Sequence, residues 1–286
     1  MAATLAAVSR RPLVLLGLAA ACASAALAVW AVAFVVPRGR LLDGRALETF
    51  TGVATARQPS IHGIAVLADP WPFGVAGAVL VVLALLRRRW LMAAVVPAIL
   101  LSANLATQWL KPALAELRVV DLRGIDAHYA QSWPSGHSTA AMSLALCLVL
   151  VVGPALRPLA ALVGAGYAIA VGYALVVLGF HLPSDVLGGY LVAATFTLLG
   201  AAALAALEAR RPVGSPRAAR PPAPLSVPAL AAFATLLVCC AAVAVVARAP
   251  GAPVNALQHP TAVLAGVVIA GLGLVLTSGL ALALRR

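Results

Sequence analysis

The sequence predicts an all-α protein that crosses a membrane several times, and three observations lead to this fold class. Of the 286 residues, 63% are hydrophobic and only 10% are charged, whereas a soluble domain carries about 25% charged residues. Predominantly apolar runs of 15 to 24 residues recur along the chain, and a helix needs about 20 residues to cross the hydrocarbon core. No long stretch alternates apolar and polar residues with a period of two, as membrane β-strands do. We therefore expect a polytopic helical membrane protein.

Eight runs are predicted to be membrane helices. In chain order they are Leu13–Val36, Trp71–Leu86, Trp90–Leu110, Ser138–Val152, Leu159–Phe180, Val186–Leu207, Val227–Ala247 and Thr261–Leu284. The second and fourth runs are short, and we expect them to extend into the flanking residues. The first run follows Arg10 and Arg11 as a signal peptide would, but it is too long for the apolar region of one. A retained helix is therefore predicted.

The charge distribution predicts the orientation. If the N-terminus lies in the cytoplasm, eight crossings place twelve arginines and one acid, Glu208, on the inner side, and eight basic and seven acidic residues on the outer side. The excess of +11 inside against +1 outside follows the positive-inside rule. The net charge of +12 is thus a topology signal, and we expect no nucleic-acid partner. Both termini are predicted to be cytoplasmic, in a multi-pass protein of the plasma membrane.

Composition divides the chain into three parts. Residues 1–207 hold six predicted helices, residues 208–226 form an Arg-, Pro- and Ala-rich stretch typical of a cytoplasmic linker, and residues 227–286 hold the last two helices. Two longer outer loops, Pro37–Pro70 and Lys111–Pro134, carry most of the other polar residues. No charged residue lies near the middle of a predicted span, which argues against a transporter or flippase because ion-coupled transport usually needs such groups.

Polar residues gather at the outer ends of the third to sixth predicted helices. The fourth and fifth helices form a hairpin with a short inner turn, so the chain returns to the face from which it left. His137 and His181 should therefore meet at one membrane surface, although 44 residues separate them. The residues that share this surface are Lys111, Arg118, Ser135, Gly136, His137, His181 and Asp185.

This set of residues suits phosphate chemistry. Lys111 and Arg118 supply fixed positive charge, and the backbone amides of residues 135–137 lie at a helix N-terminus, where anions bind. One histidine can attack phosphorus while Asp185 holds its ring, and the other can protonate the leaving oxygen. Each residue alone also has a structural interpretation, since Asp185 can cap a helix and Lys111 can extend toward the membrane interface. Together on one face they favour catalysis.

The spacing of these residues resembles the three signatures of the type 2 phosphatidic acid phosphatase family, which includes membrane lipid phosphatases. The likeness covers about residues 70–205. It rests on Lys111 with Arg118 after six residues, on PSGH at Pro134–His137, and on His181 with Asp185 after three residues. The resemblance implies a six-helix phosphatase core, an extracytoplasmic site, and no metal or other cofactor. The implied reaction is hydrolysis of a lipid phosphomonoester or diphosphate, such as a lipid phosphate or a polyprenyl diphosphate.

The resemblance also implies a role for each residue. His181 would be the nucleophile and form a phosphohistidine, Asp185 would orient it, and His137 would be the general acid. The phosphate would be held by Lys111, Arg118, Ser135 and Gly136.

Two departures from the family pattern stand in the sequence. Val119 follows Arg118 where the family has proline, and Ala174 and Leu175 stand where the third signature begins Ser-Arg. Arg123 is a candidate replacement for the missing arginine. The substitution Leu175→Arg, which restores the family residue, is expected to keep or raise activity.

These departures leave alternatives open. A phosphotransferase would pass the phosphoryl or phospho-head group to a lipid or sugar hydroxyl, and a degenerate member would have lost catalysis. A metal hydrolase would use Asp126, His128, His137 and His181, but their spacings match no known metal motif.

Overall fold

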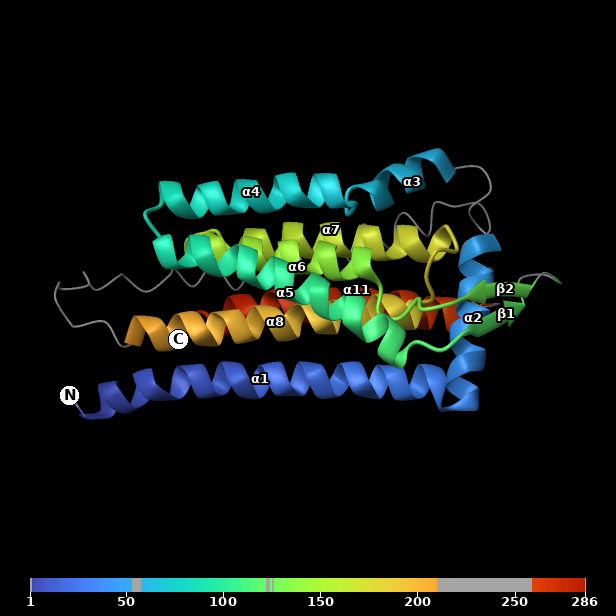
Figure 1. Ribbon diagram of the computed structural model, residues 1–286, viewed down its shortest axis with the longest axis horizontal. Coiled ribbons are helices and arrows are strands. Elements are labelled where there is room, and N and C mark those ends of the chain that lie inside the picture. Colours follow the sequence, from blue (N-terminus) through green and yellow to red (C-terminus); the bar gives the residue numbers. More distant parts are fainter. Residues whose placement is uncertain (1, 53–57, 122–123, 125, 210–258, 286) are drawn as a thin grey trace.

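The structure, a computed structural model, describes residues 2–52, 58–121, 124, 126–209 and 259–285 (Figure 1). Within these residues the chain forms a bundle of long helices with a small antiparallel sheet near one end. The helices are α1 (Ala2–Phe34), α2 (Pro37–Gly52), α3 (Gln58–Val66), α4 (Pro70–Leu86), α5 (Trp90–Leu114), α6 (Gly136–Val151), α7 (Arg157–Val177), α8 (Pro183–Ala209) and α11 (Pro260–Ala283). The prediction of a helical membrane protein is confirmed, and the sheet is an addition to it.

Five of the described helices, α1, α5, α7, α8 and α11, are long and apolar enough to cross a membrane. Helices α4 and α6 are apolar but have only 17 and 16 residues. Seven of the eight predicted runs therefore fall on helices, and the chain is a multi-pass membrane protein. The remaining run, Val227–Ala247, and residues 210–226 of the predicted linker lie outside the described residues.

Helix α11, the second of the two predicted C-terminal helices, packs against α7 and also contacts α2, α6 and α8. The Tyr173 hydroxyl on α7 donates to the Gly266 carbonyl at 2.6 Å, and Arg157 donates to the Leu284 carbonyl at 2.8 Å. Helix α1 begins and α11 ends at the same end of the bundle (Figure 1), as an even number of crossings requires. The division of the chain into a core, a linker and a C-terminal pair stays a prediction.

The first predicted outer loop, Pro37–Pro70, is largely helical, so the prediction of a loop is wrong there. Helix α2 lies across the end of the bundle (Figure 1) and contacts α1, α7, α8 and α11. It buries Gly44, Ala46 and Leu47 while Arg45 stays exposed. A polar helix of this kind is missed by a search for apolar runs because only one of its faces is buried.

The second predicted outer loop, Lys111–Pro134, contains the sheet. Strands β1 (Arg118–Asp121) and β2 (Asp126–Tyr129) pair antiparallel, with Arg118 opposite Tyr129. The strands have four residues each, which is too short for a clear alternating pattern in the sequence. We call this end of the molecule the hairpin end.

The second predicted run, Trp71–Leu86, is expected to extend into its flanking residues, and the segment that contains α3 and α4 shows how it does so. Helix α3 ends at Val66 and α4 begins at Pro70, so a bend at residues 67–69 separates two helices. The Tyr167 hydroxyl on α7 donates to the Leu67 carbonyl at 3.0 Å and ties the bend to the bundle. The expected extension is present, but as a separate helix with a break.

Helix α6 is the central helix of the bundle. Thirteen of its sixteen residues are buried, and it packs against α4, α5, α7 and α8. Helix α7 approaches closely at Gly164, where an added Cβ would lie 3.1 Å from the Ala145 carbonyl oxygen. At the opposite end, Arg89 donates to the Leu150 and Val151 carbonyls, both at 3.0 Å. At the hairpin end, α6 begins short of the end of α7 (Figure 1), so its N-terminus is recessed within the bundle.

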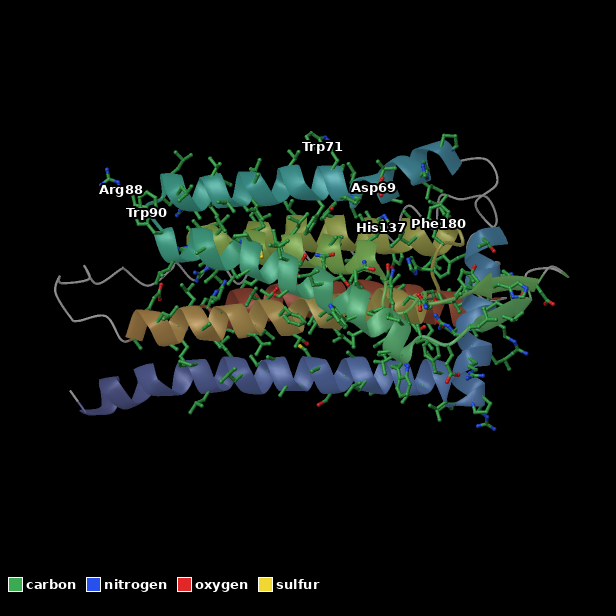
Figure 2. The ribbon with its side chains drawn as sticks, in the orientation of Figure 1. Asp69, Trp71, Arg88, Trp90, His137 and Phe180 are labelled. Carbon is green, nitrogen blue, oxygen red and sulfur yellow. The ribbon has the colours of Figure 1, made fainter. Side chains whose placement is uncertain are left out.

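Exposed tryptophans indicate where the membrane interfaces lie. Trp71 begins α4 and is 81% exposed, and Trp109 near the end of α5 is 77% exposed. At the opposite end of the bundle, Trp90 is 66% exposed and lies close to the exposed Arg88 (Figure 2). Tryptophan and arginine are enriched at the boundaries of the hydrocarbon core. The start of α6 therefore lies near the boundary at the hairpin end.

Candidate active site

The PSGH segment begins α6 and is held from two sides. Ser135 is the N-cap, and its hydroxyl accepts from the Ser138 N–H at 3.3 Å. The Ser135 N–H donates to the Asp185 carbonyl at 3.0 Å, which joins the segment to the first turn of α8. Ser135 is fully buried. Ser135 therefore caps α6, and its bond to Asp185 also places it beside the third signature.

Two glycines of α8 allow the segment to lie against that helix. A Cβ added to Gly188 would lie 2.5 Å from the indole nitrogen of Trp133. A Cβ added to Gly189 would lie 2.7 Å from the Ser135 carbonyl oxygen and 3.0 Å from the Thr139 nitrogen. Real Cβ atoms do not approach that closely, so glycine at position 188 makes room for the Trp133 side chain and glycine at position 189 makes room for the backbone of the PSGH segment and of α6.

Gly189→Ala is expected to displace the PSGH segment, because the methyl group would meet backbone atoms that cannot move alone. Overpacking of this kind costs about 1–3 kcal/mol. Thermal unfolding of the purified protein should show a lower Tm, and phosphate release should fall. Gly166→Ala on α7 is the matched control, since an added Cβ there meets nothing within 4 Å. Equal Tm and activity for Gly189→Ala and wild type would contradict the close approach.

His181 and Asp185 face each other, as their spacing predicts. The chain turns after α7 at Gly179, which has a φ of +72°, and the Tyr129 hydroxyl donates to the Gly179 carbonyl at 2.8 Å. His181 Nδ1 lies 3.3 Å from Asp185 Oδ2, and the same oxygen accepts from the Leu182 N–H at 3.1 Å. Asp185 is fully buried, so its carboxylate is fixed and can fix the ring of His181 in turn.

Arg118 uses four of its five N–H donors inside the protein. Nη1 donates to Asp43 Oδ2 at 3.2 Å and to Ser184 Oγ at 3.0 Å. Nη2 donates to Ser132 Oγ at 2.9 Å and to Asp185 Oδ1. The fifth donor, Nε–H, is buried and has no hydrogen-bond partner among the described residues. Arg118 therefore connects the site to α2, β1 and α8 at once.

Asp43 is a site residue that sequence reasoning missed. It lies on α2, and it accepts from the Ser184 N–H at 3.0 Å and from the Ser184 hydroxyl as well as from Arg118. Burial, followed by the charge of Asp185, raises the pKa of Asp43 to about 6, and the hydrogen bonds from Ser184 and the charge of Arg118 oppose this rise. No motif marks the residue. Its only sequence signal is an acid next to the buried face of an amphipathic helix.

A cavity of about 480 Å³ opens beside His181 at the hairpin end. Lys111, in the last turn of α5, lies on the same cavity wall as His181. An added Cβ on Gly136 would lie 3.9 Å from the Lys111 Nζ, so the ammonium group faces the start of α6. The other residues of the lining with polar side-chain groups are His128, Tyr129, Gln131 and Ser132. The structure therefore brings His181 and Lys111 together around a space large enough for a small ligand. The N-terminus of α6 does not line this space but lies next to the Lys111 ammonium group.

His137 lies in the first turn of α6 but outside the set of described residues that line this cavity. Its Nε2 lies 2.8 Å from Oδ1 of Asp69, in the bend between α3 and α4 (Figure 2). Both side chains are partly exposed. Within the described ranges, no group of three or more His, Cys, Asp or Glu side chains is placed to hold a metal ion.

Two positions are connected with the arginine that is missing from the family pattern: Arg123 as its candidate replacement, and Leu175 as the residue that stands in its place. Arg123 lies outside the described residues. Leu175 is fully buried in the apolar core of the bundle, as is its neighbour Ala174. This burial changes the expectation for Leu175→Arg, because a guanidinium there would replace a fully buried side chain of the apolar core.

Leu175→Arg is now expected to destabilise the protein by several kcal/mol, since it buries an unpaired charge in an apolar core. The yield of monodisperse protein and its Tm should both fall, and activity should fall with them. Leu175→Met, which nearly conserves volume, should cost less than about 1.5 kcal/mol. A well-folded Leu175→Arg protein with raised phosphate release would instead support the original expectation.

Comparison with known proteins agrees with this arrangement. Residues 93–209 match the family model of the PAP2 superfamily. The crystal structure of the first transmembrane PAP2-type phosphatidylglycerolphosphate phosphatase from Bacillus subtilis matches with a TM-score of 0.53 and 20% sequence identity, over 68% of this chain and 98% of that chain. Comparison with curated proteins found no significant match.

The matched segment runs from α5 to the end of α8 and contains every motif residue named above. Residues 93–209 are therefore similar to the PAP2 superfamily, and the chain has the fold of a transmembrane PAP2-type phosphatase. The predicted relationship to type 2 phosphatidic acid phosphatases is confirmed. Asp43 and Asp69 lie outside the matched segment, in α2 and in the bend before α4.

Proposed function

We propose that this protein is a membrane lipid phosphatase that hydrolyses a phosphomonoester or diphosphate of a lipid through a phosphohistidine intermediate. The observation that carries the proposal is the cavity shared by Lys111 and His181, with the ring of His181 paired to the buried Asp185. A fixed positive charge and an oriented imidazole beside one cavity, with a helix N-terminus next to that charge, are groups that phosphoryl transfer needs.

The first step forms the phosphoenzyme. His181 donates its Nδ1–H to Asp185, which leaves the Nε2 lone pair free to attack phosphorus. The bond between phosphorus and the lipid oxygen breaks, and that oxygen takes a proton from His137 as it leaves. Lys111, the Nε–H of Arg118 and the amides of residues 135–137 offset the charge that develops on the phosphoryl oxygens.

The second step releases phosphate. Water gives a proton to His137 and attacks the phosphorus, and the bond between phosphorus and Nε2 of His181 breaks. The nitrogen regains its lone pair, inorganic phosphate leaves, and His137 is protonated again for the next cycle. This scheme uses no metal or other cofactor. Full activity in the presence of a chelator is expected, and metal-dependent recovery after chelation would contradict it.

The test of the proposal is phosphate release by the purified protein in lipid nanodiscs. The substrates to compare are phosphatidic acid, phosphatidylglycerol phosphate and polyprenyl diphosphate, which all carry a terminal phosphate but differ in the rest of the lipid. Release from at least one lipid, and its loss in His181→Ala, is the expected result. The absence of release from every lipid, by a protein that is folded, would indicate a degenerate member of the superfamily.

Phosphoryl transfer to an acceptor other than water is the second candidate. The cavity of about 480 Å³ is larger than one phosphate group, and His128 and Gln131 give its wall polar groups that could hold a hydroxyl compound. Glycerol or a sugar added during turnover would then yield a phosphorylated acceptor at the expense of inorganic phosphate. Unchanged yields of inorganic phosphate would leave hydrolysis as the reaction.

We further propose a plasma-membrane location with both termini in the cytoplasm and the hairpin end outside, on the strength of the arginine distribution. With Cys22, Cys147, Cys239 and Cys240 removed, His128→Cys at the exposed β2 strand should react in intact cells with an impermeant thiol reagent. Arg88→Cys should react only after lysis. The reverse labelling pattern would place the site on the cytoplasmic side.

A further inference from the structure

The contact between Asp69 and His137 is the feature of the hairpin end that the mechanism above leaves unexplained. Oδ1 of Asp69 lies 2.8 Å from Nε2 of His137, although 68 residues separate them in the chain. The contact joins the bend between α3 and α4 to the first turn of α6 (Figure 2). The site thus holds two histidine–aspartate pairs, one at His181 and one at His137.

The local sequence explains why the Asp69 carboxylate is available. Asp69 is the N-cap of α4, in an extended conformation with φ −64° and ψ 159°, and an aspartate there normally accepts from the N–H groups of the second or third helical residue. The sequence Asp-Pro-Trp-Pro places prolines at the first and third helical positions. Proline has no N–H, so of those two donors only the Trp71 N–H remains. The side chain makes no cap hydrogen bond. It reaches across to His137 instead.

The bend that carries Asp69 is held in place independently of this contact. The Tyr167 hydroxyl on α7 donates to the Leu67 carbonyl at 3.0 Å. The Asp69 N–H donates to the Val66 carbonyl at 3.0 Å, and Ala68 is buried against the bundle. The carboxylate is therefore presented by a fixed backbone, as a residue that must hold a histidine ring in one orientation requires.

Stability alone gives little reason for the pair. The two side chains are 38% and 41% exposed, and ion pairs with such exposure add little to folding stability. A carboxylate that accepts from one nitrogen of an imidazole fixes the ring and its tautomer, and it stabilises the imidazolium when that forms. The effect expected from this pair is therefore on proton transfer.

We propose that Asp69 is the positioning residue of the general acid, so that each catalytic histidine has its own carboxylate; this inference rests on the proposed function. Asp69 accepts the Nε2–H of His137 and leaves Nδ1 as the nitrogen that exchanges protons with the reacting oxygens. In the first step the Nδ1 proton passes to the lipid oxygen as its bond to phosphorus breaks. In the second step Nδ1 takes a proton from water, and the imidazolium forms beside the Asp69 carboxylate.

The first test compares two leaving groups in the rate at which the phosphoenzyme forms, measured by rapid quench on full-length protein. Asp69→Asn should slow phosphoenzyme formation from a lipid phosphate, whose alkoxide needs a proton, about 10-fold or more. With p-nitrophenyl phosphate, whose leaving group needs no proton, the rate should change less than about threefold. Asp69→Asn should add nothing in a His137→Ala background, because the two act as one unit. Glu116→Gln, an exposed carboxylate at the same end, is the matched control and should match wild type.

Three outcomes of this test would overturn the proposal. Equal slowing with both leaving groups would indicate a structural role. A faster reaction in Asp69→Asn would mean that Asp69 restrains His137 and competes with substrate. Additive losses in the double variant would show that the two residues act separately.

The second test does not depend on activity, so it separates this inference from the proposed function. In protein labelled with ¹⁵N-histidine, the His137 signal is identified by its loss in His137→Ala. The neutral ring is expected to carry its proton on Nε2 in wild type and to lose this preference in Asp69→Ala. A tautomer that does not change in Asp69→Ala would refute the inference even if the protein is an active phosphatase. A tautomer that changes as expected, in a protein that releases no phosphate, would uphold the contact and refute only the proposed function.

Discussion

His181→Ala is expected to abolish phosphate release from every substrate and to leave no trappable phosphoenzyme. Nε2 of His181 is the nucleophile in the proposed mechanism, and the methyl side chain that replaces the ring cannot form a bond to phosphorus. The side chain of His181 is only 13% exposed, but the buried Asp185 keeps its ion pair with Arg118 when the ring is lost. The variant should therefore fold, which makes the loss of chemistry interpretable.

Rapid-quench trapping with a radiolabelled phosphate substrate is the measurement. Wild type should carry a label that is labile in acid and stable in base, as a phosphohistidine is, and His181→Ala should carry none. His259→Ala is the matched control, because this exposed histidine precedes α11 at the same end of the molecule and has no role in the scheme. Label on His181→Ala at the wild-type level would show that another residue is the nucleophile.

Two further variants, His137→Ala and Asp185→Asn, separate the roles of the general acid and of the carboxylate that orients His181. His137→Ala should still be labelled from p-nitrophenyl phosphate and should keep its label longer, because the residue that activates water is gone. Asp185→Asn should fall between wild type and His181→Ala, since the nucleophile remains but its ring is no longer oriented. If His137→Ala processes a lipid phosphate and p-nitrophenyl phosphate equally well, the PSGH segment serves only as a helix cap.

Arg118→Ala and Lys111→Ala are both expected to lose most of their activity, but for different reasons. The guanidinium of Arg118 is 5% exposed and lies between two buried carboxylates, Asp43 and Asp185. Its removal leaves both without their cation, which costs about 3–5 kcal/mol for a buried pair. Lys111 lines the open cavity, so Lys111→Ala should keep the fold and lower kcat/KM about 100-fold by removing charge from the transition state.

The measurement pairs thermal unfolding with kinetics on the same preparations. A low Tm with low activity is expected for Arg118→Ala, and a wild-type Tm with low activity for Lys111→Ala. Arg118→Lys keeps the charge but offers three donors from one nitrogen instead of a planar fork, so it should recover stability only in part. A wild-type Tm for inactive Arg118→Ala would mean that Arg118 acts mainly as a phosphate ligand, as the family pattern implies.

The parts of the fold that could be predicted are those with local signals. Long apolar runs indicated seven of the described helices, and the hairpin formed by α6 and α7 brought the PSGH segment and His181 to one end. The i,i+4 spacing of His181 and Asp185 predicted their contact, because four residues bring side chains to one face of a helical turn.

The acids that complete the site could not be predicted from the same signals. Asp43 and Asp69 are single carboxylates in stretches that contain no motif, and they contact residues 75 and 68 positions away. Hydrophobic periodicity gives no information about such pairs. Their only local indications are the buried face of α2 next to Asp43 and the two prolines that follow Asp69.

The arginine of the family pattern that is missing here shows a different limit of prediction from sequence. Its absence could be read from Leu175, but the burial of that side chain could not, since a leucine near the end of α7 fits equally well in the core or at the site. The sequence departs from the family at this position, and the structure fills the space with apolar packing.

The contacts of Arg118 have a consequence for how the protein is made. The arginine bonds to Asp43, 75 positions earlier, and to Asp185, 67 positions later. The ribosome completes α2 before β1 and β1 well before α8, so the arginine emerges with only one of its two carboxylates available. The second arrives when α8 enters the membrane and closes the bundle. In a chain arrested or misinserted before that point, Arg118 has Asp43 as its only carboxylate partner, and His181 lacks the carboxylate that orients its ring. The site can therefore form only if α8 inserts correctly into the membrane. In variants with altered insertion of α8, the measured phosphatase activity would show what fraction of the chains inserted correctly.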